Sequence, residues 1–99
     1  MQIILHAGDC RNSVTEALEL LENGKDSSTV DDKMKEAKEE ITEAHKIQTE
    51  MIQHTIETDD FETTLLFSHA QDTLMTIYSE LNMAKHIIKL YRNLEAKNK

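Results

Sequence analysis

Histidine is the residue type in this sequence that offers the most chemistry. The 99 residues include five of them: His6, His45, His54, His69 and His86. An imidazole has a reference pKa of about 6.5, so near pH 7 its neutral nitrogen can act as a nucleophile, a metal ligand or a proton carrier. Composition and spacing alone do not select one of the five for such a role.

Two of the spacings would suit a metal site on a helix. His6 and Cys10 are four residues apart, as are Glu50 and His54, so each pair would share one helix face. The less specific interpretations are a small core cysteine and a surface Glu–His pair. The Glu-x-x-His pairs of di-iron bundles do not occur. A metal or redox bundle built on His6, Cys10 and other histidines is therefore one alternative.

Several other function classes lack their motifs. Gly8 and Gly24 are the only glycines, and two isolated glycines cannot form a phosphate-binding loop. The single cysteine excludes an intrachain disulfide and a Cys-x-x-Cys motif. The net charge of −8 lacks the basic footprint that nucleic-acid phosphates require, so we expect no nucleic-acid partner.

The length and hydropathy of the chain predict one domain over residues 1–99. No apolar run approaches the roughly 18 residues of a membrane span, so we expect no membrane insertion. The segment 1–6 lacks the basic flank of a signal peptide, which favours a cytoplasmic location.

The elements that must position the histidines are helices. Proline is absent, and apolar residues recur in three- and four-residue steps. This pattern predicts helices at about 2–23, 30–57 and 62–95, hence an all-α, three-helix up-down-up bundle. The expected core positions of the first two helices are Ile3, Ala7, Cys10, Val14, Ala17, Leu21, Met34, Ala37, Ile41, Ala44, Gln48 and Met51.

Residues that favour helix ends mark the expected boundaries. Asn23 and Gly24 should stop the first helix, because glycine accepts the left-handed conformation that closes it. Thr29 should cap the second helix, and Asp59 or Asp60 the third.

The third helix has two faces with little charge. One is apolar and should pack on the other helices: Leu66, Ala70, Leu74, Ile77, Leu81, Ala84 and Ile88. The other repeats at the same steps: His69, Asp72, Thr76, Ser79, Met83, His86 and Leu90. A bundle this small cannot cover both faces, so the second face indicates contact with copies of itself in an oligomer. The alternative is a solvated polar face.

Asp72 bears on that choice. A carboxylate in a self-associating seam is costly unless it is protonated, hydrogen-bonded or bound to metal. The simpler interpretation places Asp72 at the edge of the seam, pointing to water.

The segment Ser68-His69-Ala70-Gln71-Asp72-Thr73-Leu74-Met75-Thr76 is distinctive. It closely resembles the His-Ala-Gln-Asp-His-Leu-Met-Thr signature of the lactose/cellobiose (diacetylchitobiose)-type IIA components of the phosphoenolpyruvate-dependent sugar phosphotransferase system. Segments 7–11 and 43–52 resemble the first and second helices of that family, and Asn23-Gly24 falls at the turn between them. The resemblance therefore runs through nearly the whole chain, in order.

The resemblance implies a function and an assembly. Family members are homotrimers of three-helix subunits that form a nine-helix bundle. The signature histidine corresponds to His69, which would accept a phosphoryl group from the phosphohistidine of HPr and pass it to a cysteine of a IIB protein. The signature aspartate corresponds to Asp72, which would cluster around the threefold axis, where Mg²⁺ can offset the three charges.

The sequence departs from the family pattern in two respects. Thr73 replaces the second histidine that is common in the signature, although that residue is not the phosphoryl acceptor. Family members also usually carry extra residues before the first helix. The resemblance does not identify the sugar, because the membrane IIC partner selects it. The alternative function is a helical oligomeric adaptor without chemistry.

Overall fold

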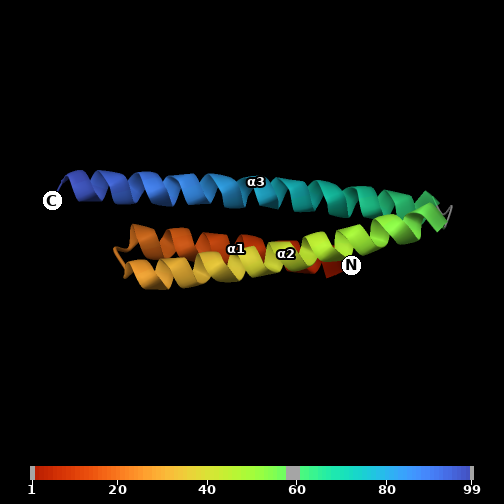
Figure 1. Cartoon of the computed structure of the whole chain (residues 1–99), viewed down its shortest axis with the longest axis horizontal. Helices are drawn as coiled ribbons and strands as arrows, with labels where there is room; N and C mark the ends of the chain where they lie inside the picture. The colour runs from red at the N-terminus through yellow and green to blue at the C-terminus, as the bar shows by residue number, and fades with distance from the viewer. Residues whose placement is uncertain (1, 58–60, 99) are drawn as a thin grey trace.

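The protein is a bundle of three long helices, as the sequence pattern predicts. The computed structural model describes residues 2–57 and 61–98, and for 54–57 and 61–64 it describes the backbone alone. Helix α1 comprises Gln2–Glu22, α2 Ser27–Glu57 and α3 Phe61–Lys97, and no strand occurs in the described ranges. The bundle measures 60 × 17 × 16 Å, with α1 and α3 running parallel and α2 antiparallel to both (Figure 1).

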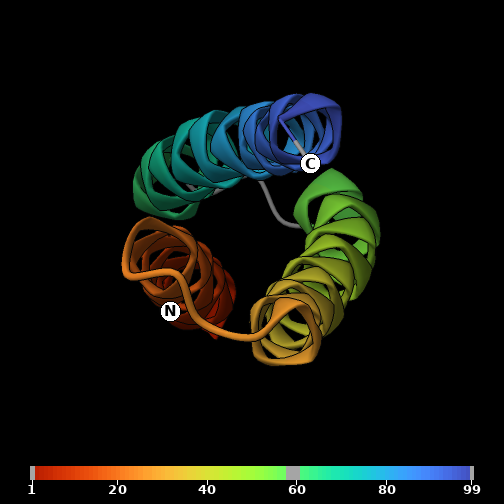
Figure 2. The same cartoon turned by 90° about the vertical axis from the view of Figure 1, so that its left-hand side faces the viewer.

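Viewed along its axis, the molecule places the three helices around a common core (Figure 2). The expected core positions of α1 are all buried, from Ile3 at 0% exposure to Leu21 at 9%. Those of α2 are buried or partly buried, and Val30 joins them. Burial of one Ile, Leu or Val side chain stabilises the fold by about 1.5–3 kcal/mol. The buried apolar positions of α1 and α2 therefore hold the bundle together.

The turn between α1 and α2 has a defined helix-ending geometry. The amide of Lys25 donates to the carbonyl of Leu20 at 2.9 Å, and that of Gly24 to Leu21 at 3.1 Å. This pair of hydrogen bonds is the Schellman motif, which needs a left-handed residue after the helix. Gly24 has that conformation, with φ of 69°, so the predicted stop at Asn23-Gly24 is confirmed.

The start of α2 differs from the prediction. The helix begins at Ser27, not near residue 30, and its cap is Asp26 rather than Thr29. A carboxylate oxygen of Asp26 accepts a hydrogen bond from the amide of Ser28 at 3.3 Å. Because that carboxylate satisfies an amide of the first turn, the helix can begin three residues earlier. The expected caps at Asp59 and Asp60 lie outside the described residues.

Helix α3 packs on α1 and α2 through what we call the inner stripe. Its members are buried, with at most 5% exposure: Ala70, Leu74, Ile77, Leu81, Ala84 and Ile88. The prediction was wrong for Leu66, which is 58% exposed. Arg11 pairs with Glu80, and this register of α1 beside α3 leaves no residue of α1 level with Leu66.

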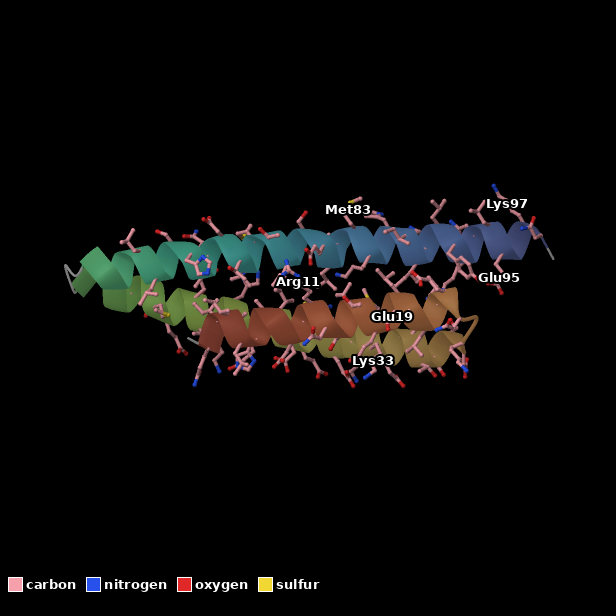
Figure 3. The ribbon with its side chains drawn as sticks, turned by 180° about the vertical axis from the view of Figure 1, so that it is seen from behind. Arg11, Glu19, Lys33, Met83, Glu95 and Lys97 are labelled. Atoms are coloured by element: carbon pink, nitrogen blue, oxygen red, sulfur yellow. The ribbon has the colours of Figure 1, made fainter. Side chains whose placement is uncertain are left out.

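The opposite face of α3 is uncovered within one chain. We call it the outer stripe, and all its members are exposed: His69, Asp72, Thr76, Ser79, Met83, His86 and Leu90. Figure 3 shows Met83 pointing away from α1 and α2, while Arg11 lies between α1 and α3. Met83 and Leu90 are 59% and 60% exposed. Within one chain, α3 therefore buries one face against α1 and α2, as predicted, and leaves the opposite face exposed.

Ion pairs at the edges of the core mark how the helices align. Arg11 makes two hydrogen bonds of 2.9 Å to Glu80, joining α1 to α3. Lys33 lies 2.8 Å from Glu16, joining α2 to α1. Within the described part of the chain, no helix has an apolar stretch long enough to cross a membrane.

Candidate functional site

His69 lies on the exposed side of α3, next to a residue that anchors the helix. Its neighbour Ala70 is completely buried, and that contact sets the rotation of this part of α3. The hydroxyl of Thr73 donates to the backbone carbonyl of His69 at 3.0 Å. The ring of His69 is therefore accessible while the backbone below it is held by the core.

Asp72 lies one helical turn after His69 on the same stripe and is also exposed. The hydroxyl of Thr76 donates to the carbonyl oxygen of Asp72 at 2.8 Å. The carboxylate of Asp72 has no hydrogen bond or ion pair to any other described residue. Within one chain its side chain is exposed to solvent.

Gln71 makes no hydrogen bond to the side chain of His69 in the single chain, as far as the described residues show. The side chain of Gln71 is exposed. A role for Gln71 in orienting the ring would require the phosphorylated state or a second subunit.

The site lies toward the end of the bundle that α1 does not reach. Because Arg11 of α1 is level with Glu80 of α3, His69 is level with the first residues of α1. Figure 1 shows the end of α2 and the start of α3 lying beyond the start of α1.

The other described histidines have different surroundings. The Nδ1 atom of His6 lies 2.6 Å from a carboxylate oxygen of Glu40, and both side chains are partly buried. The ring of His45 meets that of Tyr78 edge to face, with centroids 5.3 Å apart. His86 is exposed on the outer stripe, and the side chain of His54 lies outside the described residues.

The sequence suggested that His6 and Cys10 could bind a metal together, but the structure does not group their ligand atoms. Cys10 is completely buried in the core. Burial, together with the charges of Glu40 and Glu80, raises the pKa of its thiol to about 11, so it is protonated at neutral pH. The groups around His6 are instead Asp9 and Glu40. The spacing of His6 and Asp9 could have indicated that they share a helix face. The proximity of Glu40 could not be inferred from the sequence, because it depends on how α2 aligns with α1.

Comparisons with known proteins agree with this architecture. The family described as "PTS system, Lactose/Cellobiose specific IIA subunit" matches residues 1–92. The chain belongs to this family of the sugar phosphotransferase system, and its role is that of a phosphoryl carrier in sugar uptake.

Individual relatives are similar over most of their length. The lichenan-specific phosphotransferase enzyme IIA component of Bacillus subtilis (strain 168) is 42% identical over 94% of this chain and 84% of its own. The lactose-specific EIIA component of Streptococcus mutans is 33% identical over 92% and 86%. The crystal structure of the cellobiose-specific enzyme IIA from Bacillus anthracis superposes with a TM-score of 0.83 at 42% identity, covering 97% of this chain and 87% of that one. The family predicted from the signature segment is thus confirmed.

Proposed function

We propose that His69 is the residue that carries the phosphoryl group, taking it from the phosphohistidine of HPr and giving it to a cysteine of a IIB protein. The observation that carries this proposal is the exposed position of His69, within the signature segment, on the uncovered face of α3. Membership in a phosphoryl-carrier family supports it, as does the accessibility that two successive protein partners require.

The chemistry needs a nucleophile, a good leaving group and alignment. A neutral imidazole nitrogen of His69 attacks phosphorus, the new P–N bond forms, and the P–N bond to the donor histidine breaks. In the second transfer a thiolate of IIB attacks, a P–S bond forms, and the imidazole of His69 leaves. Such transfers depend mainly on in-line positioning and charge stabilisation, which the docked partners and the rigid helix would supply.

We further propose that the outer stripe assembles three chains into a homotrimer. The stripe repeats at the three- and four-residue steps of a coiled-coil seam, with Met83 and Leu90 exposed to more than half of their surface. Contacts between three outer stripes would cover these side chains and add to the subunit's own core. The trimer would also place each His69 beside a neighbouring subunit.

Asp72 fits a structural Mg²⁺ at the axis of that trimer, and we propose this as its role. Mg²⁺ prefers hard oxygen ligands, and the Asp72 carboxylate is exposed and engages no other described residue. A single carboxylate is too few for a site, so the ion would need Asp72 from each chain. When bound, Mg²⁺ would offset the mutual repulsion of the carboxylates. The sedimentation coefficient should then fall on chelation, and an Asp72→Leu trimer should not respond to the chelator. An unchanged coefficient in both cases would remove the metal role.

A transfer assay with matched variants tests the carrier function. The chain, enzyme I, HPr and phosphoenolpyruvate are combined, and phosphate is then followed onto an added IIB protein. His69→Gln should abolish transfer, whereas His86→Gln, on the same stripe, should retain the ability to accept phosphate. Phosphorylation of the His69→Gln protein at the wild-type rate would overturn the proposal.

A further inference from the structure

A second group of chemistry-bearing side chains lies between α1 and α2 and includes no residue of the outer stripe. His6 and Asp9 belong to α1 and Glu40 to α2, and one ligand atom from each lies within 4.8 Å of the others. The side chains of His6 and Glu40 are 26% and 33% exposed, so part of each is shielded from water. The carrier function described above uses none of these residues.

The surroundings of this group attract cations. It opens onto a groove of about 340 Å³ that only α1 and α2 line, and that includes Glu16, Glu36 and Glu39. Among the described residues of the lining, Lys33 is the one cation. It pairs with Glu16 and Glu36, two helical turns from Glu40. Carboxylates that line a concave surface raise the local concentration of cations.

The imidazole of His6 makes the group more selective among metal ions than a cluster of carboxylates alone. Calcium and magnesium prefer oxygen ligands alone, whereas nitrogen from histidine suits zinc and its neighbours in the first transition series. Zinc sites with an open position use three protein ligands from histidine and carboxylate side chains, and water fills the fourth position. His6, Asp9 and Glu40 supply this number and type of ligand.

We propose that His6, Asp9 and Glu40 form a zinc site that ties the first turns of α1 to the middle of α2. Zinc–ligand bonds of about 2.1 Å place tetrahedral ligand atoms about 3.4 Å apart. The Nδ1 atom of His6 and the Oε2 atom of Glu40 are 2.6 Å apart, so they need to separate by less than about 1 Å. Rotation of these partly exposed side chains provides that movement, and the ion replaces their direct hydrogen bond.

The buried thiol next to the site is not part of it. Cys10 follows Asp9 directly and lies one helical turn after His6, but its side chain is completely buried in the core, and its sulfur does not belong to the group of ligand atoms formed by the other three side chains. The zinc site therefore uses nitrogen and oxygen ligands, not sulfur.

Zinc binding by the full chain is the direct test. Chelator-stripped protein is dialysed against zinc chloride, and zinc and protein are quantified. We expect one zinc ion per chain, with affinity reduced at least tenfold in His6→Gln and Glu40→Gln. The matched controls are His86→Gln, an exposed histidine outside the group, and Glu39→Gln, which removes the same charge from the groove. Both should bind zinc like the wild type.

A thermal melt of each variant adds a second readout. Saturating zinc should raise the unfolding temperature of the wild type by about 5 °C or more, because a ligand of the folded state stabilises it by mass action. Asp9→Asn, whose side chain is exposed, should fold normally and lose most of this shift.

Three results would overturn the proposal. The first is no zinc bound by the stripped wild type. The second is an equal loss of zinc affinity in Glu39→Gln and Glu40→Gln, which would mean that the negative charge of the groove alone attracts the ion. The third is one zinc per three chains, lost in Asp72→Asn but kept in His6→Gln, which would place the ion at the outer stripe. None of these results depends on whether His69 carries phosphate.

Discussion

The inner and outer stripes of α3 share one helix and one repeat, yet they have opposite environments. Leu74 and Leu81, on the inner stripe, are at most 1% exposed, whereas Met83 and Leu90, on the outer stripe, are 59% and 60% exposed. The inner stripe contains only aliphatic residues, while the outer stripe mixes apolar residues with histidine, aspartate, serine and threonine. The inner stripe holds the three helices together, whereas the outer stripe is the face to which we assign the proposed trimer contacts and the phosphoryl-carrying histidine.

Truncation of one leucine on each stripe should give the largest contrast. Leu74→Ala should lower the free energy of unfolding by about 2–5 kcal/mol, since it leaves a cavity in the core. Leu90→Ala should leave the helical content of the subunit unchanged and act only through the oligomer. Urea denaturation followed by circular dichroism, at several protein concentrations, measures both effects. Equal destabilisation that does not depend on concentration would contradict the distinction between the stripes.

A charge placed on the outer stripe should break the proposed trimer. In Met83→Glu, each subunit would have to bury a carboxylate in the interface, which costs several kcal/mol unless it is paired. We expect the concentration at which trimers dissociate to rise at least tenfold, as measured by sedimentation velocity. Thr49→Glu, at an exposed position on α2, is the matched control and should remain trimeric. A Met83→Glu protein that sediments like the wild type would show that the outer stripe is not the interface.

The buried thiol of the core should make stability depend on pH. The pKa of Cys10 rises from 9.0 to about 11 on folding, mainly because the thiol is buried. Above pH 9 the unfolded chain loses this proton while the folded chain keeps it, so stability falls as pH rises through that window. The expected loss at pH 10 is about 1 kcal/mol relative to pH 8. Denaturation of the wild type and Cys10→Ala at both pH values isolates this contribution, and an identical loss in both proteins would contradict it.

The ion pair between α1 and α3 should contribute least. Arg11 and Glu80 have 48% and 44% exposed side chains, so water and salt screen their attraction. A double-mutant cycle with Arg11→Ala and Glu80→Ala should give a coupling energy below about 1 kcal/mol that falls at high salt. A coupling of several kcal/mol would mean that the pair, rather than the inner stripe, holds α3 in place.

Much of the fold follows from the repeat of apolar residues, because burial is the strongest constraint on a helix of this kind. Every predicted core position of α1 is buried, as are the six residues of the inner stripe of α3. Leu66 was misassigned because the repeat cannot reveal where the neighbouring helix begins. The start of α2 was misplaced because Asp26 and Thr29 are both good caps, and only the backbone geometry distinguishes them.

The candidate site was less predictable from the residues themselves. Five histidines with the same side chain differ only in their surroundings, so the pattern left His69 equivalent to His45 or His86. The resemblance of the signature segment selected His69, and the structure adds its exposure on α3. The grouping of His6 with Glu40 could not be predicted. The two residues are 34 positions apart in the sequence, and their contact depends on how α1 and α2 align.

Direct mapping of the phosphate on the wild-type chain tests the central claim. After incubation with enzyme I, HPr and phosphoenolpyruvate, the chain is digested at alkaline pH and its peptides are sequenced by mass spectrometry. We predict one acid-labile phosphoryl group per chain, on the imidazole of His69, which disappears when a IIB protein is added. A phosphoryl group on any other histidine, or none at all, would contradict the account.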